Sequence, residues 1–300
     1  MNVPQFAEFL KLQDYRVIKT KSCYWYTNTS RFFYQSFPYH RGINLSRKEI
    51  IDFFIKSESF AGKYLTYGEV SEKDKSIWIC DNKNYDLSCL HQNARNKVRR
   101  GAERCKIEMV DFKWLESKGM PLIRDTLCRQ NRPTSTITEG MWKKLCVAAR
   151  RIPDFEAWGS FANGKLAAFI VLGIVEDYSY FLERYSLTEY LKYYHPNNVL
   201  TFLVTKEMFS SRKVKGVISG VEPFEELRGL NDYKSKMGFE RKHLKQRVIV
   251  NPLAILFLNS FSLKIIENIT SRYSSDYSRK MSGFIRFYRM QKQRDAQIAI

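Results

Sequence analysis

Apolar and polar positions form their clearest pattern in the middle of the chain. A segment rich in apolar residues, Phe155 to Phe161, is followed by Ala162-Asn163-Gly164-Lys165 and then by the apolar run Leu166–Val175. Asn-Gly supplies the positive backbone angles that a tight hairpin turn requires. A third segment with strand character, Tyr178–Tyr185, follows after a short turn. The pattern therefore predicts a hairpin that is extended by a third strand.

Helical spacing follows these strands. Leu200, Leu203, Val204 and Met208 share one face of a helix that begins at Pro196, because residues three and four positions apart are neighbours on a helix surface. Three more elements are expected downstream: a short strand at Val217–Ser219, a helix at Phe224–Lys236 and a strand at Lys245–Val250. The second half of the chain thus has the order ββ-β-α-β-α-β.

The first half has weaker patterns. Its first 45 residues are rich in Tyr, Phe and polar strand formers, which favours strands over helix. Ser46 and Glu49 have the spacing of a capping box, and Ile50, Phe53 and Phe54 give the predicted helix an apolar face. The other elements expected here are strands at Lys63–Glu69, Ser76–Cys80 and Ile107–Val110, a helix within Asp86–Arg104, and helices around Phe112–Cys128 and Thr138–Arg151.

The C-terminal part of the chain leaves two alternatives open. Its apolar segment Val248–Ile266 is interrupted by polar residues, so we interpret it as a strand end followed by a core helix from Pro252, and less readily as a membrane span. Further on, a basic helix carries an apolar stripe of Met281, Phe284, Ile285 and Tyr288. That stripe either packs on the protein itself or on a partner subunit, or lies on an anionic membrane surface.

Composition limits the classes of partner. The 300 residues include 50 Lys and Arg against 31 Asp and Glu, a net charge of +19, and 44% are hydrophobic. The apolar fraction is sufficient for packed cores, and the charge favours an anionic partner such as RNA, a phosphate-rich cofactor, a polysaccharide or a membrane surface. A basic surface that is simply solvated is the equally weighted alternative.

Six cysteines are spread along the chain without a close pair, which gives neither a zinc-binding nor a redox motif. We expect them to be reduced and buried, and no signal peptide is recognised at the N-terminus. These observations predict a cytoplasmic protein, which the basic C-terminal helix can bring to the inner face of the membrane. No metal site and no permanently bound cofactor are expected.

Four passages carry a resemblance to a known group of proteins. They are the Arg-rich helix and short strand at Asn93–Val110, the hairpin at Gly159–Leu172, the helix start Pro196-Asn197-Asn198-Val199-Leu200, and Tyr233-Lys234-Ser235-Lys236-Met237-Gly238-Phe239. In combination and order they resemble the GNAT acyltransferase fold, and in particular its divergent branch of Fem-type aminoacyltransferases and acetyltransferases of polysaccharide biosynthesis. The last passage is similar to the Phe-Lys-x-x-Phe-Gly ending of that branch.

The resemblance implies an α+β fold with a GNAT-like mixed sheet flanked by helices, built as two GNAT-like halves of which the first is degenerate. The segments expected are the degenerate half at 1–135, an acyltransferase domain at 136–252 and a basic helical extension at 253–300. The implied enzyme transfers an acyl group from acyl-CoA or aminoacyl-tRNA to an amino or hydroxyl group of a cell-envelope or exopolysaccharide precursor, a small-molecule or glycan acceptor. A non-catalytic protein that binds RNA or anionic membranes on this scaffold is the alternative.

One departure from the GNAT pattern concerns the donor. The Gln-x-x-Gly-x-Gly loop that holds pyrophosphate in ordinary GNAT enzymes is absent, and Tyr193-Tyr194-His195-Pro196 stands in its place. Acyl-CoA is still expected as a co-substrate, because backbone amides after Pro196 can receive an anionic group at the helix N-terminus. Asn197 and Asn198 add side-chain donors there, or act as helix caps. Some members of the branch use aminoacyl-tRNA, which also suits the positive charge.

Acyl transfer requires a base, an acid and a polarised carbonyl group. His195 or Glu183 is the expected base, and Tyr193 or Tyr194 is expected to protonate the leaving group. Each has a structural alternative: a histidine in a surface turn, a solvated glutamate at a strand end, or tyrosines that only pack.

Two sets of cations complete the expected site. Lys234 and Lys236 either bind phosphate or carboxylate as point charges, or form a solvated helix end. A larger set suits a polyanion such as tRNA, because several guanidinium groups on one helix can contact successive phosphates. This set consists of Arg95, Lys97, Arg99, Arg100 and Arg104.

Overall fold

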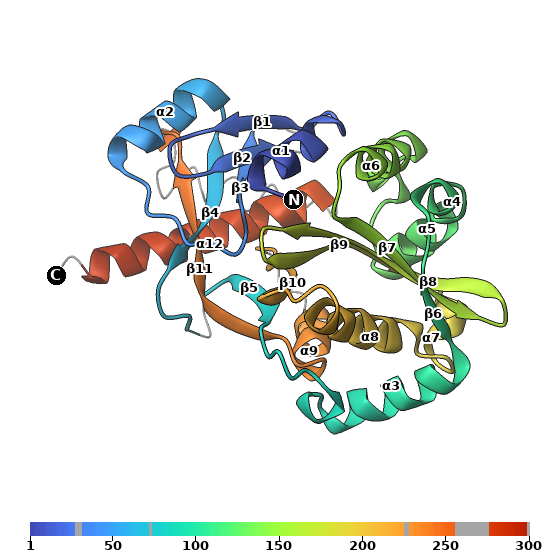
Figure 1. Cartoon of the computed structure of the whole chain (residues 1–300). Coiled ribbons are helices and arrows are strands. Elements are labelled where there is room, and N and C mark those ends of the chain that lie inside the picture. The colour runs from blue at the N-terminus through green and yellow to red at the C-terminus, as the bar shows by residue number, and fades with distance from the viewer. Residues whose placement is uncertain (28–31, 72–73, 225–227, 256–275, 299–300) are drawn as a thin grey trace. The chain divides into compact units, whose positions relative to one another are not determined.

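A computed structural model describes the chain except residues 28–31, 72–73, 225–227, 256–275 and 299–300 (Figure 1). The chain forms two compact units that are interleaved in sequence. Unit 1 consists of Met1–Asp14, Trp78–Gly220 and Gly229–Glu240, and unit 2 of Tyr15–Ile77, Val221–Arg228 and Arg241–Ile300. These units differ from the contiguous segments 1–135, 136–252 and 253–300 expected from the sequence, because each unit takes residues from both halves of the chain.

The sheet of unit 1 has the strand order β6-β7-β8-β9-β10, and the end of β5 (Ser76–Cys80) lies next to β10. Its other strands are β6 (Lys106–Met109), β7 (Phe155–Ala162), β8 (Lys165–Val175), β9 (Tyr178–Ser186) and β10 (Gly216–Val221). β6 to β9 are antiparallel neighbours, whereas β10 is parallel to β9. Asn163 and Gly164 have positive φ in the turn between β7 and β8. The predicted hairpin and third strand are therefore confirmed.

Helices cover both faces of this sheet (Figure 1). One face carries α3 (Gln92–Arg104), α8 (Pro196–Ser210) and α9 (Arg228–Lys236), and the other carries α1 (Val3–Lys11), α4 (Phe112–Lys118), α5 (Met120–Arg129) and α6 (Glu139–Arg151). Successive side chains of β8 point to opposite faces of the sheet, so this strand contacts both helical layers. Ile170 packs in the core under α8, while the ring of Phe169 lies 5.4 Å from that of Trp142 in α6. A short helix, α7 (Thr188–Leu191), precedes α8.

α1 corrects the sequence-based expectation that the first residues favour strands over helix. Asn2 and Gln5 form a capping box at its start, with Pro4 in the first turn. The rings of Phe6 and Phe9 are buried and stack on Phe155 of β7. These aromatic residues favour a strand by propensity, but in the folded chain they form the buried face of a helix, because tertiary packing outweighs propensity.

The sheet of unit 2 has the order β1-β2-β3-β4-β11. Its strands are β1 (Arg16–Lys19), β2 (Tyr24–Thr27), β3 (Phe33–Phe37), β4 (Ala61–Tyr67) and β11 (Glu240–Val250). β3 and β4 are parallel and are joined through α2 (Arg47–Ser57), whose predicted cap Ser46 accepts a hydrogen bond from the Glu49 amide. The ring centre of Phe53 in α2 lies 4.2 Å from that of Trp25 in the core.

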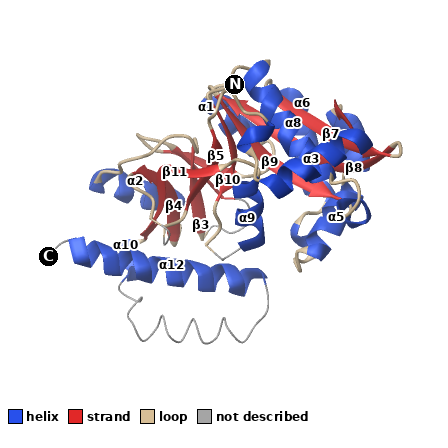
Figure 2. Cartoon of the chain, turned by 90° about the horizontal axis from the view of Figure 1, so that it is seen from below, coloured by secondary structure: helices blue, strands red, loops and turns tan. Residues whose placement is uncertain are grey.

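The C-terminal helix α12 (Asp276–Ile298) packs on the sheet within unit 2 (Figure 2). Phe284, Ile285 and Tyr288 are buried in one cluster with Val248 and Val250 of β11. The alternative in which the apolar stripe packs on the protein itself is therefore confirmed. β11 ends and α10 (Pro252–Ile255) begins where predicted, but most of the apolar segment after Pro252 lies outside the described residues. None of the helices in the described ranges is both long and apolar enough to cross a membrane.

Candidate functional site

β9 and β10 separate within the sheet of unit 1. Their parallel pairing joins Gly216–Ile218 to Tyr178–Tyr180, although β9 continues to Ser186 and β10 to Val221. Past this point β9 contains a bulge, because Phe181 faces Leu172 and Glu183 faces Val171, which leaves Leu182 as the extra residue. A bulge bends its strand and increases the local twist. The last part of β9 therefore turns from β10, and its edge is not paired with that strand.

Glu183 lies on β9 just past the bulge and points to the helical layer of α5 and α6. Its carboxylate accepts a short hydrogen bond from the hydroxyl of Tyr185, whose ring is 5.4 Å from that of Phe169. Burial raises the pKa of Glu183 above its ordinary value, while the Tyr185 hydroxyl and the charge of Arg132 oppose the rise. A carboxyl group with a raised pKa is a better proton acceptor near neutral pH.

Arg184 points to the opposite face, where α8 and α9 lie. Its guanidinium is 5.9 Å from the ring centre of Phe181, and burial lowers its pKa. Nη1 of Arg184 is buried without a hydrogen-bond partner, as is the hydroxyl of Ser219 on β10, and within the described part of the chain no carboxylate pairs with this arginine. Buried polar groups are normally satisfied. The two groups therefore mark the strand separation as a place for a polar ligand.

Tyr233 and Lys234 of α9 are adjacent to this region. The Tyr233 hydroxyl donates to the carbonyl of Asn197 at 2.9 Å and contacts Thr201 at 2.9 Å, and burial raises its pKa. Lys234 is only 3% exposed, and its Nζ lies 3.9 Å from the position that a Cβ on Gly220 would occupy. Gly220 has a φ of +95° at the end of β10, so an ammonium group lies where β10 leaves its pairing with β9.

Lys234 and Lys236 have different environments despite being neighbours in the motif. Lys236 is exposed, and its Nζ forms an ion pair with Asp232 at 2.6 Å. For Lys236 the alternative of a solvated helix end therefore applies. Lys234 is buried in unit 1. From the sequence, both lysines were equally good candidates for binding phosphate or carboxylate, because they are the same residue type on the same helix. The sequence did not indicate Arg184 or Tyr233 as site residues, because only their burial in the folded chain distinguishes them.

The first turn of α8 holds His195, Asn197 and Asn198. His195 has a φ of +49°, and its Nδ1 is 3.1 Å from the Leu191 carbonyl oxygen. Burial lowers the pKa of His195, and three nearby cations of α3 lower it further. The side-chain amide of Asn197 donates to Ser186 at 2.9 Å and that of Asn198 to the Met237 sulphur at 3.4 Å. Both amides thus make contacts inside the protein.

Tyr193 and Tyr194 hold the corner between α7 and α8. Arg104 stacks on the ring of Tyr193 at 3.9 Å and donates to its carbonyl at 2.7 Å, and the Tyr194 hydroxyl accepts from Asn163 at 2.7 Å. Both tyrosines and His195 belong to the α8 layer, whereas Glu183 points to the α5 layer. The structure therefore does not gather the four residues expected as catalytic. At the strand separation, Arg184 lies near Tyr233 on the α8–α9 side, where Lys234 is also found, whereas Glu183 lies on the α5 side of β9.

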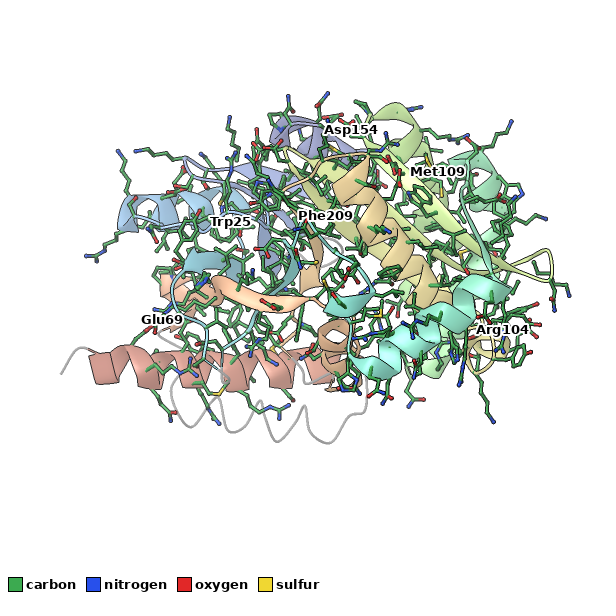
Figure 3. The ribbon with its side chains drawn as sticks, turned by 60° about the horizontal axis from the view of Figure 1, so that its bottom comes forward. Trp25, Glu69, Arg104, Met109, Asp154 and Phe209 are labelled. Carbon is green, nitrogen blue, oxygen red and sulfur yellow. The ribbon has the colours of Figure 1, made fainter. Side chains whose placement is uncertain are left out.

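The basic set on α3 lies beside the buried face of that helix and on its exposed side. Ala94, Val98 and Gly101 are buried, and Lys97, Arg99 and Arg100 are exposed. Arg95 donates to the Leu90 carbonyl at 3.3 Å, and Arg104 lies at the C-terminal end of the helix (Figure 3). No ion pair involves these five cations in the described ranges.

Among the described residues no cluster of three His, Cys, Asp or Glu side chains lies close enough to hold a metal ion. All six cysteines are free, but Cys128 is exposed and Cys89 and Cys105 are half-buried, so the expectation of burial is wrong for these three.

Unit 2 contains a cavity of about 360 Å³ between β11 and α12. Its walls include Arg247 and Asp295, which pair at 2.7 Å, and Arg294 and Asp74, which form a shorter ion pair. The two arginines of the cavity are therefore neutralised by neighbouring carboxylates.

No protein-family profile matches this sequence, and no curated protein matches it. Solved structures do. A C-terminal domain from a protein assigned as a lysylphosphatidylglycerol synthetase of Agrobacterium fabrum has a TM-score of 0.56 at 11% identity, covering 86% of this chain and 91% of that one. FemX has a TM-score of 0.54 at 12% identity, covering 84% and 92%. L-PGS from Bacillus licheniformis has 0.52 at 9%, covering 85% and 89%.

Each likeness spans more of the chain than either compact unit contains. At these identities the likeness concerns the fold. The chain shares with these structures a mixed sheet flanked by helices, so the expected GNAT-like fold class is confirmed.

Proposed function

We propose that this protein is an acyltransferase that moves an acyl or aminoacyl group to an amino or hydroxyl group of a cell-envelope or exopolysaccharide precursor. The observation that carries the proposal is the separation of β9 and β10, with a carboxyl group of raised pKa, a buried ammonium and an unpaired buried guanidinium beside it. The likeness in fold to FemX and to a lysylphosphatidylglycerol synthetase supports the same class of reaction.

In the proposed reaction the acyl group lies at the unpaired edge of β9, with its carbonyl oxygen on the side of α9. The acceptor nitrogen or oxygen approaches from the α5 side, forms a bond to the acyl carbon and gives its proton to Glu183. The carbonyl electron pair moves to oxygen, and Lys234 stabilises the resulting oxyanion, because a fixed cation away from bulk water stabilises developing charge strongly. When the carbonyl re-forms, the bond to the leaving oxygen or sulphur breaks. The leaving atom takes a proton from the Tyr233 hydroxyl, which is protonated at neutral pH and whose pKa is raised further by burial. Tyr233 then recovers a proton from solvent, and Glu183 releases the one that it accepted.

Aminoacyl-tRNA is the donor that we favour, and acyl-CoA is the second candidate. The glycine-rich pyrophosphate loop is absent, and the side-chain amides of Asn197 and Asn198 bond to Ser186 and Met237 rather than facing a ligand. The exposed cations of α3 add a surface suited to a longer polyanion. Acyl-CoA is supported by the backbone amides at the start of α8, since helix N-termini bind phosphate groups.

The test compares transfer rates of Lys234→Met and Lys236→Met proteins with the wild type, using aminoacyl-tRNA, acetyl-CoA and longer acyl-CoA as donors. Loss of one group that stabilises an oxyanion typically lowers kcat by about 100-fold or more, and this is expected for Lys234→Met. Lys236→Met, which removes an exposed paired lysine, should retain the wild-type rate.

Thermal unfolding of both variants separates loss of chemistry from loss of the fold. Equal rates for the two variants would remove Lys234 from the mechanism. A wild-type protein that consumes none of the donors, while it binds RNA or anionic vesicles, would replace the enzyme with the non-catalytic alternative.

A further inference from the structure

The corner between α3 and α8 combines unpaired cations with an exposed aromatic ring. We define the α3–α8 corner as Lys97, Arg100, Arg104, Lys192 and Tyr193. We propose that this corner is the docking surface for the single-stranded 3′ end of an RNA, which deepens the proposed function by locating the tRNA part of the donor, and which rests on that function for its biological role.

Packing between the two helices fixes the position of this surface. Gly101 of α3 allows close approach, because a Cβ there would lie 2.9 Å from Cβ of Val199 and 3.1 Å from the carbonyl oxygen of Tyr194. Ala94 and Val98 continue the buried face of α3. Three cations of α3 therefore lie toward the first turn of α8: Lys97, Arg100 and Arg104. Their positive charges lower the pKa of His195.

The charge of the corner is not neutralised within the protein. In the described ranges, no ion pair involves any of the four cations of the corner, although many other cations of unit 1 are paired. From Lys97 to Arg104 the helix advances by roughly 10 Å, which is more than a single diphosphate group needs and suits successive phosphates of one strand.

Tyr193 provides the feature that a purely ionic surface lacks. Its side chain is 58% exposed, yet its position is fixed, because Arg104 stacks on the ring at 3.9 Å and donates to the backbone carbonyl of the same residue at 2.7 Å. A fixed aromatic ring flanked by arginine is a platform on which an unpaired base can stack. A membrane surface would be matched better by several exposed apolar side chains than by one tyrosine.

The corner also adjoins the proposed reaction site within unit 1. Asn197, two residues after His195, donates to Ser186 at the end of β9. A strand that crosses the corner and ends there would present its terminal ribose beside the part of β9 that carries Glu183 and Arg184. This placement matches a donor whose acyl group is attached to the 3′ end of an RNA.

The experiment measures binding of a fluorescent single-stranded RNA that ends in CCA, by anisotropy at several salt concentrations. Lys97→Ser/Arg100→Ser should weaken binding and reduce the slope of log K against log salt by about 1.4, since each phosphate contact on a single strand contributes roughly 0.7. Tyr193→Ala should weaken binding by about 5-fold to 150-fold with an unchanged slope, from the loss of one stacked base. Lys113→Ser/Lys118→Ser removes two exposed lysines of unit 1 and should bind as the wild type.

Three results would overturn the inference. They are equal losses for the corner and control pairs, no effect of Tyr193→Ala, and corner variants that lose binding to CoA or to phosphatidylglycerol vesicles but not to RNA. The Lys234→Met protein is expected to bind the RNA normally. RNA binding at the corner without transfer from any donor would contradict the proposed function alone, and transfer with unaltered RNA binding in the corner variants would contradict this inference alone.

Discussion

At the residue scale, burial determines what each charged side chain near the strand separation can do. Glu183 has a raised pKa because it is partly surrounded by protein, whereas Glu189, a few positions on, is exposed to water. Lys234 and Lys236 differ in the same way. The chemical identity of these residues is written in the sequence, but the free energy of their charged forms depends on neighbours that are distant in sequence.

Glu183→Gln is expected to abolish the acid limb of the pH profile. In the wild type, kcat/KM should rise with pH through an apparent pKa above the ordinary 4.5 of glutamate, because only the carboxylate accepts the proton. The variant should be slower by roughly 100-fold to 10,000-fold and lack this limb. Glu189→Gln is the matched control. An unchanged limb in the Glu183 variant would assign the base to another residue.

The same variant has a predicted effect on stability. A raised folded-state pKa means that the folded protein holds a proton that the unfolded chain has already released, so the wild type loses stability as the pH rises from about 4.5 through the folded-state pKa. Glu183→Gln removes this loss. Urea unfolding should therefore show the variant gaining stability relative to wild type between pH 4 and pH 8, and a constant difference would contradict the assigned direction.

At the scale of elements, the packing of α3 on α8 depends on Gly101. Its Val199 and Tyr194 neighbours leave no room for a larger side chain, so Gly101→Val should destabilise the protein by about 1–3 kcal/mol through overpacking. Ala102→Val, on the exposed side of the same helix, should cost only about 0.5 kcal/mol from helix propensity. Urea unfolding measures both, and equal losses would show that the two helices do not pack closely at Gly101.

Elements with strong local signals were predicted well. The turn Asn163-Gly164 fixes the β7–β8 hairpin, and the sequence placed β5 at its observed bounds. α1 was missed because its aromatic residues favour strands locally but pack on β7 in the folded chain. The stripe on α12 was recognised as apolar, and the structure decided that β11 covers it. Peripheral membrane binding through the charged side of this helix stays a prediction.

At the scale of the whole molecule, the interleaving of the two units makes the contiguous segments dependent on each other. Unit 1 needs α3 and β6 from the first half of the chain, because α3 packs on α8 and β6 pairs with β7. We therefore expect residues 136–252 expressed alone to be unfolded, as judged by circular dichroism and by poor dispersion in amide NMR spectra. A well-dispersed spectrum of this fragment would show that the expected acyltransferase segment folds independently.

The sequence by itself determined the order of strands and helices from residue 155 to 250 and their resemblance to a GNAT-like fold, because turn residues and apolar periodicity act over short distances. Only the tertiary structure decided which charged groups meet. The separation of β9 from β10, the burial of Arg184 and Lys234, and the position of Tyr233 all arise from contacts between segments far apart in the chain. Desolvation by such contacts, which no local pattern encodes, selects the candidate site from the 50 Lys and Arg and the 31 Asp and Glu of the sequence.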